Sequence, residues 1–229
     1  MKKTHLIFLH GALGSQLQWQ PISSQFEKEY VVHVPNFPGH GQSNTALKES
    51  SYLTLAEWLD NYIQANAITN YGIIGYSMGG YIGLQHLLKN TKINCEFLIT
   101  IATKLAWNQE IAEKEVEQLT LEKLEPIANK LREEHLVTIE TLLKNTQEIL
   151  LSIGKKPLLN SDFANNKIPV FMLLGGKDKM VTAQEILSFQ ENQPNMYFEH
   201  LENQPHLLER MDPLLLTEKI ALILKTLIN

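Results

Sequence analysis

The chain has 229 residues, of which 44% are hydrophobic and 20% charged, and this balance predicts a soluble globular protein rather than a disordered one. The net charge of −5 argues against nucleic acid or an anionic membrane surface as a partner. No apolar run reaches the roughly 18 residues of a membrane span, and the single cysteine, Cys95, excludes an internal disulfide.

The first apolar run, residues 6–9, predicts a strand that is buried on both faces. It is shorter than the roughly 7–15 residues of a signal-peptide core, so we expect a cytoplasmic protein whose first strand lies here. A glycine-rich turn follows at residues 10–15. The pattern then predicts a helix over 18–26, with Trp19, Ile22 and Phe26 on its inward side. A strand over 30–34 and a loop at 35–43 are expected next.

Strand-like and helix-like segments continue to alternate up to Lys104. The predicted elements are a helix over 55–67, a strand over 72–76, a helix over 78–89 and a strand over 95–102. After Lys104 strand-like runs disappear, and Glu, Lys and Leu recur at helical spacing up to about residue 155, with Pro126 expected near a helix start. The alternation then resumes with a strand over 169–174, a helix over 182–192, a strand over 196–201 and a helix over 213–228.

This order of elements predicts an α/β fold in which a parallel sheet is covered by helices on both faces. We expect about six mostly parallel strands and a helical cap, or lid, inserted after the fourth strand. The predicted boundaries place the core at residues 1–104 and 160–229 and the cap at residues 105–159.

Ser77 lies in Gly75-Tyr76-Ser77-Met78-Gly79, at the end of an apolar strand and the start of a helix. A serine on such a tight turn takes strained backbone angles, and side chains two residues away on either side would collide with the neighbouring backbone. Glycine at both positions therefore favours an exposed, nucleophilic serine.

Serine becomes a good nucleophile when a histidine, held by a carboxylate, accepts its proton. His206 lies in a loop just past the last predicted strand, and Asp178 follows the strand before it. In a parallel sheet both loops lie on the same edge as the Ser77 turn. The other histidines weighed for this role are interpreted as structural or solvated: His5, His33, His86, His135 and His200. Asp162, in the linker, and Asp212, which precedes Pro213 like a helix cap, are weaker candidates for the acid.

An oxyanion hole requires two backbone N–H donors beside the serine. The Met78 N–H is free because it begins a helix, and the Ala12 N–H lies in the turn after the first strand. We expect these two amides to point at the same place. No metal-binding motif or phosphate-binding loop is present, and we expect no cofactor.

The motifs together resemble the α/β-hydrolase superfamily. They run across nearly the whole chain: residues 10–15 (HGALGS), 38–43 (PGHGQS), 75–80 (GYSMGG), 175–178 (GGKD) and His206. The resemblance implies Ser77 as nucleophile, Asp178 as acid and His206 as base, with a cap that shapes the substrate pocket. Pro205 is a departure, because the residue before the histidine is often glycine in relatives.

The serine nucleophile favours some members of the superfamily over those that use aspartate. We expect a small-molecule carboxylesterase or thioesterase that forms an acyl-enzyme with a small or medium apolar acyl group. Alternatives on the same fold are the menaquinone-pathway lyase that releases pyruvate, a C–C bond hydrolase, and a ligand-binding protein with a slow or vestigial triad. In the lyase an arginine usually follows the elbow, where this chain has Tyr81, and its multi-carboxylate substrate would call for arginine partners.

Candidate pocket residues are Tyr81 beside the elbow and Leu105, Trp107, Leu119 and Leu136 in the cap. Apolar residues of amphipathic helices are also used for packing, so the sequence alone does not separate the two roles. It leaves open the natural substrate, the acyl length and whether the protein is a monomer or a dimer.

Overall fold

The structure, a computed structural model, describes residues 3–47, 49–89 and 94–228. Its strands are β1 (His5–Leu9), β2 (Val31–His33), β3 (Tyr71–Tyr76), β4 (Cys95–Ile101), β5 (Val170–Gly175) and β6 (Met196–Leu201). Its α-helices are α1 (Gln20–Ser23), α2 (Tyr52–Ala65), α3 (Met78–Lys89), α4 (Gln109–Val116), α5 (Leu121–Glu134), α6 (Ile139–Lys155), α7 (Ala183–Gln190) and α8 (Pro213–Ile228). Short 3-10 helices lie at η1 (Gln16–Trp19), η2 (Ser24–Phe26), η3 (Asn160–Phe163) and η4 (Leu208–Arg210).

The six strands form one sheet in the order β2-β1-β3-β4-β5-β6. Every pair of neighbouring strands is parallel. The predicted architecture is therefore confirmed. A sheet with this order reverses its winding between β1 and β3, which is where ligands bind in open parallel sheets.

Both faces of the sheet are buried, as the continuous apolar runs predict. Alternate residues of β1 point to opposite sides, so that Ile7 packs with α2 and α3 while Phe8 packs with Trp19 and α8. Each side thus has its own hydrophobic core, and the sheet between them is held rigidly enough to position the loops at its carboxyl edge.

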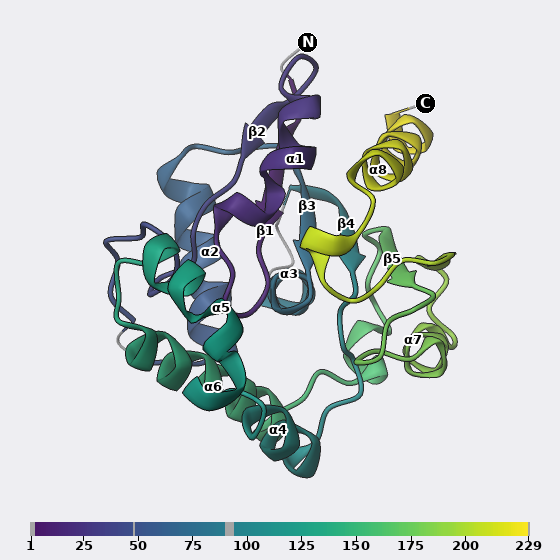
Figure 1. The fold of residues 1–229 in the computed structure, drawn as a ribbon. Helices are drawn as coiled ribbons and strands as arrows, with labels where there is room; N and C mark the ends of the chain where they lie inside the picture. Colours follow the sequence, from purple (N-terminus) through teal and green to yellow (C-terminus); the bar gives the residue numbers. More distant parts are fainter. Residues whose placement is uncertain (1–2, 48, 90–93, 229) are drawn as a thin grey trace.

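The chain between β4 and β5 forms α4, α5 and α6, which gather below the sheet in Figure 1. Each begins with a side-chain cap, from Asn108, Thr120 and Thr138 respectively. Because Thr120 sets the start of α5, Pro126 lies inside this helix. The prediction that Pro126 lies near a helix start is therefore wrong.

Two other predicted elements differ in detail. The segment predicted as one helix over 18–26 is divided into η1, α1 and η2, since Pro21 has no N–H with which to continue a helix. Its predicted inward side chains, Trp19, Ile22 and Phe26, are nevertheless all buried. Helix α2 starts three residues earlier than predicted because Ser51 caps it.

Among the residues that the structure describes, no helix has both the length and the apolar character needed to cross a bilayer.

Candidate active site

Ser77 lies at the tight turn between β3 and α3. Its φ of +49° is in the left-handed region, which a residue with a side chain adopts only when its surroundings enforce it. Here the Ser77 N–H donates to the Ile101 carbonyl at 2.8 Å, and the Thr103 hydroxyl donates to the Ser77 carbonyl at 3.1 Å. The end of β4 therefore holds the turn in place.

The turn after β1 lies against this elbow. A Cβ atom added to Gly11 would come within 2.6 Å of the Tyr76 ring and 3.5 Å of Ser77 Cβ, so glycine permits the close approach. The Gly11 N–H donates to Gln18 Oε1 at 3.0 Å, and the Gln18 amide donates to Glu209 at 2.9 Å. Gln18 thus connects this turn to the segment that follows His206.

Asp178 and His206 are brought together from the loops after β5 and β6. The His206 Nδ1–H donates to Asp178 Oδ2 at 2.8 Å, because an ionised carboxylate can only accept. The other carboxylate oxygen, Oδ1, accepts the N–H groups of Met180 at 2.8 Å and Val181 at 2.9 Å. The Asp178 side chain is fully buried and that of His206 is 11% exposed. Pro205 does not prevent this pairing.

The environment of Asp178 favours its charged form. Burial alone would raise the pKa of this carboxyl, but the hydrogen bond and charge of His206, together with the Val181 and Met180 amides, hold the pKa below its usual value. Asp178 is therefore an ionised acceptor that fixes the His206 ring with Nε2 directed away from it.

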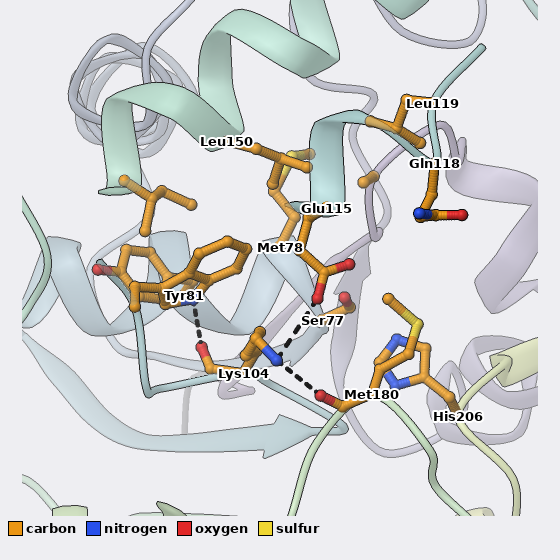
Figure 2. Close-up of a pocket in the computed structure, with 13 residues that line it drawn as sticks. Ser77, Met78, Tyr81, Lys104, Glu115, Gln118, Leu119, Leu150, Met180 and His206 are labelled. Atoms are coloured by element: carbon orange, nitrogen blue, oxygen red, sulfur yellow. Dashed lines mark hydrogen bonds and ion pairs between the residues drawn. The ribbon is translucent and has the colours of Figure 1, made fainter. Parts of the chain in front are cut away.

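Ser77 and His206 line one cavity of about 310 Å³, shown in Figure 2. In the described chain no hydrogen bond joins the Ser77 hydroxyl to His206. Catalytic hydrogen bonds are often long in structures without substrate and shorten only when substrate binds. The arrangement of hydroxyl, imidazole and carboxylate is suited to nucleophilic catalysis of acyl transfer.

The two predicted oxyanion donors also border this cavity, since Ala12 and Met78 are both among its lining residues. Met78 is the first residue of α3, whose first-turn N–H groups have no acceptor within the helix. Both residues therefore lie at the cavity that Ser77 lines, with Met78 at the positive end of a helix.

The remaining wall of the cavity is mostly apolar and comes largely from the segment between β4 and β5. It is formed by Tyr81, Lys104, Trp107, Glu115, Gln118, Leu119, Leu150, Ile153 and Met180. Tyr81 is anchored because its hydroxyl accepts the Leu158 N–H at 2.7 Å, and burial raises the pKa of that hydroxyl. Trp107 is anchored because its indole N–H donates to the Lys104 carbonyl at 2.9 Å.

Three of the five predicted pocket residues, Tyr81, Trp107 and Leu119, are thus at the cavity. Leu105 and Leu136 lie elsewhere. Leu105 is 4% exposed and packs in the main core. Leu136 is 55% exposed just beyond the end of α5. Both belong to segments with apolar spacing, and spacing alone does not say whether a residue faces a core, a cavity or solvent.

Sequence reasoning missed several lining residues: Lys104, Glu115, Gln118, Leu150, Ile153 and Met180. Leu150 and Ile153 stand three residues apart on the apolar stripe of α6, a signal that indicates burial without identifying a cavity. Nothing in the sequence indicated that Lys104 and Glu115 line a cavity, because a charged residue at the end of a strand or on a short helix is ordinarily solvated.

The acids and histidines interpreted as structural or solvated lie outside this cavity. Asp212 accepts the Leu214 and Leu215 amides at the start of α8, as predicted for a helix cap, and Asp162 accepts the Leu159 amide. The histidines have the following surroundings: His5 bonds His33, His86 bonds Tyr71 and Asp60, His135 bonds Gly41 and Leu13, and His200 is exposed.

A family model described as the α/β-hydrolase fold matches residues 4–121, slightly more than half of the chain. The chain therefore belongs to the α/β-hydrolase fold family, in agreement with the motifs and with the sheet.

Individual proteins resemble this chain either in part of their sequence or in their fold. The 2-succinyl-6-hydroxy-2,4-cyclohexadiene-1-carboxylate synthase of Yersinia pseudotuberculosis is 38% identical over 81 residues, which are 35% of this chain and 29% of that enzyme. The match thus spans less than a third of the curated relative's length. Among solved structures, MenH from S. aureus superposes with a TM-score of 0.82 at 20% identity, covering 100% of this chain and 96% of that one. An esterase from Thermogutta terrifontis superposes with a TM-score of 0.80 at 17% identity, covering 98% and 90%. At these identities the two structures establish the shared fold alone.

Proposed function

We propose that the protein is a serine hydrolase that cleaves an ester or thioester of a small or medium apolar acyl group through an acyl-enzyme. The observation that carries this proposal is the single cavity lined by both Ser77 and His206, with His206 bonded to the buried Asp178. An apolar pocket with a few convergent polar groups is the usual form of a small-molecule site.

In the proposed reaction the Ser77 Oγ attacks the acyl carbonyl carbon while His206 Nε2 accepts the hydroxyl proton. Asp178 keeps the His206 proton on Nδ1 and stabilises the imidazolium that forms. The Ala12 and Met78 N–H groups donate to the oxyanion. His206 then protonates the leaving alcohol or thiol, and a water molecule, activated by the same base, releases the acid from Ser77.

The charge of the cavity favours an apolar acyl group. Apart from His206, its charged lining residues within the described chain are Lys104 and Glu115, which lie 3.5 Å apart and offset each other. The two arginines, Arg132 and Arg210, are not among the lining residues.

A pyruvate-eliminating lyase is the second candidate, and the similarity to the synthase over 81 residues favours it. The name of that enzyme describes a product with a succinyl and a carboxylate group, so its site handles anionic groups. Arginine is the preferred bidentate partner for carboxylates. Because this cavity offers a single, already paired lysine, we place the hydrolase first.

Turnover of p-nitrophenyl acetate and butyrate tests the proposal. We expect Ser77→Ala to lose at least about 10³-fold in kcat/KM, because the nucleophile is removed while the binding site is kept. A fluorophosphonate should label the wild type and not the variant. Ser188→Ala, an exposed serine on α7, is the control and should keep both activities. Equal turnover by wild type and Ser77→Ala would contradict the proposal.

A further inference from the structure

Lys104 and Glu115 form an ion pair across the opening between the sheet and the inserted helices. Lys104 follows β4, Glu115 lies near the end of α4, and their charged atoms, Nζ and Oε1, are 3.5 Å apart. Figure 2 shows both side chains within the group that lines the cavity with Ser77. The Lys104 Nζ also donates to the Met180 carbonyl at 2.8 Å.

The pair is more shielded from water than the exposed lysine–glutamate pair on the same helix. The Lys104 and Glu115 side chains are 18% and 22% exposed. On the same helix, Glu110 and Lys114 form a closer pair at 2.7 Å, but their side chains are 74% and 68% exposed. Charges that are removed from water interact more strongly with each other, and with a bound ligand, than charges on an open surface.

We propose that this pair determines the charge selectivity of the cavity. Glu115 neutralises Lys104 and repels an anionic acyl chain, so that the wild-type cavity accepts neutral acyl groups. Glu115→Gln leaves the Lys104 charge uncompensated and converts the cavity to one that accepts an acyl group ending in a carboxylate. The inference rests on the proposed function, because it concerns the acyl group that Ser77 would receive.

The chemistry of lysine makes such a conversion feasible. An ammonium group has three N–H donors, and Met180 takes one of them. In Glu115→Gln the side chain keeps its size and an acceptor oxygen, while the negative charge is lost. A substrate carboxylate can then take the role that Glu115 has in the wild type, next to an otherwise apolar wall.

The test compares two esters of equal acyl length, p-nitrophenyl hexanoate and mono-p-nitrophenyl adipate, which differ by a terminal carboxylate. We expect the wild type to prefer the hexanoate and Glu115→Gln to shift the ratio of kcat/KM values toward the adipate by about tenfold or more. The shift should shrink at high salt, since it is electrostatic. Glu110→Gln, which removes the same charge from the exposed pair, should keep the wild-type ratio.

A second substitution identifies the charge responsible. In Glu115→Gln/Lys104→Gln the gain on the adipate ester should disappear, because the free cation is gone. A gain that survives without Lys104, an unchanged ratio in Glu115→Gln, or an equal shift in Glu110→Gln would overturn the inference.

Binding measurements separate this inference from the proposed function. Methyl hexanoate and monomethyl adipate can be titrated into Ser77→Ala and Ser77→Ala/Glu115→Gln, where no turnover is needed. Tighter binding of monomethyl adipate in the second protein supports the role of the pair even if the wild type hydrolyses neither ester. Equal affinities in both proteins overturn it, whatever the outcome of the esterase assays.

Discussion

The backbone at Ser77 explains the residues on either side of it. A Cβ atom on Gly79 would lie 2.3 Å from the Leu9 carbonyl oxygen, and one on Gly75 would lie 2.5 Å from the Gly80 nitrogen. Both contacts are with backbone, which has no room to move inside a buried sheet. The prediction that these two positions must be glycine is confirmed, and the positive φ of Ser77 follows from the same turn.

Asp178 has two roles that a substitution can separate. One carboxylate oxygen accepts N–H groups of its own loop, and the other accepts the His206 N–H. In Asp178→Asn the amide oxygen can still accept the Met180 and Val181 N–H groups, so we expect the fold to survive. The negative charge that stabilises the His206 imidazolium is lost, and the ring is free to take the other tautomer. We expect kcat for p-nitrophenyl butyrate to fall by about 10³–10⁴-fold, as measured by steady-state kinetics at pH 7.5.

Asp212→Asn is a matched control for this substitution. Asp212 Oδ1 accepts two successive amides in the same manner, from Leu214 at 2.9 Å and Leu215 at 3.3 Å, but it caps α8. We expect this variant to turn over at the wild-type rate. A comparable loss in both variants would show that the effect comes from disturbed loops rather than from His206.

At the scale of elements, the helices α4 and α6 both contribute to the cavity wall, and Gly154 lies where they pack closely. A Cβ atom at Gly154 would lie 2.5 Å from Ala112 Cβ and 2.8 Å from the Asn108 carbonyl oxygen, both on the α4 side of the contact. Glu115 is on α4 and Ile153 on α6, so the spacing of these helices sets the width of the cavity.

Gly154→Ala sets two effects against each other. Alanine gains about 1 kcal/mol in helix propensity, whereas overpacking a tight contact costs about 1–3 kcal/mol. Because one neighbour is backbone, we expect the second effect to prevail, with a net loss of about 1 kcal/mol and a Tm lower by about 2–4 °C in differential scanning calorimetry.

The double variant Gly154→Ala/Ala112→Gly moves the methyl group from α4 to α6. This removes the closer of the two contacts, the one with Ala112 Cβ. We therefore expect Gly154→Ala to lower the free energy of unfolding less in the Ala112→Gly protein than in the wild type. A Gly154→Ala protein that melts at or above the wild-type temperature would mean that the helices are not this close.

For the whole molecule, the sequence predicts the sheet and the catalytic loops well because both follow from strong local patterns. Strand β6 and helix α8 have the predicted bounds, and the loops after β3, β5 and β6 follow buried runs with turn residues. The residues expected at these loops, Ser77, Asp178 and His206, come together because parallel strands end at one edge.

The cavity wall was less predictable for a physical reason. Leu105 and Leu136 occupy apolar positions of the same kind as Leu150, but which of them meets the cavity depends on how α4, α5 and α6 pack over the sheet. That packing is tertiary. Likewise, the Lys104–Glu115 pair joins two segments whose approach no local pattern specifies.

Behind the turn after β1 the fold also encloses a cluster of three histidines, His10, His40 and His135. The ring centroids of His10 and His40 are 5.2 Å apart, and those of His40 and His135 are 6.2 Å apart. His135 joins three segments, since it accepts the Gly41 N–H at 2.8 Å and contacts the Leu13 carbonyl at 3.2 Å. Burial, followed by the His40 charge, lowers the pKa of His10, and burial lowers that of His135.

His40 makes the stability of the whole protein dependent on pH. Burial, opposed by the Pro38 carbonyl and assisted by His135, lowers its pKa from 6.5 to about 4. Between pH 6.5 and about pH 4 the unfolded chain therefore binds a proton at His40 that the folded protein does not bind. As the pH falls through this window, the free energy of unfolding decreases by up to about 1.4 kcal/mol per pH unit.

In urea unfolding between pH 7.5 and 4.5, we expect His40→Asn to flatten this decline in the free energy of unfolding. His200→Asn, at an exposed position on β6, is the control and should keep the decline. Asp178 acts at lower pH, because its lowered pKa stabilises the folded protein above about pH 3.8 and this stabilisation is lost as the pH falls below that value. An unchanged slope in His40→Asn would mean that folding does not lower the pKa of His40.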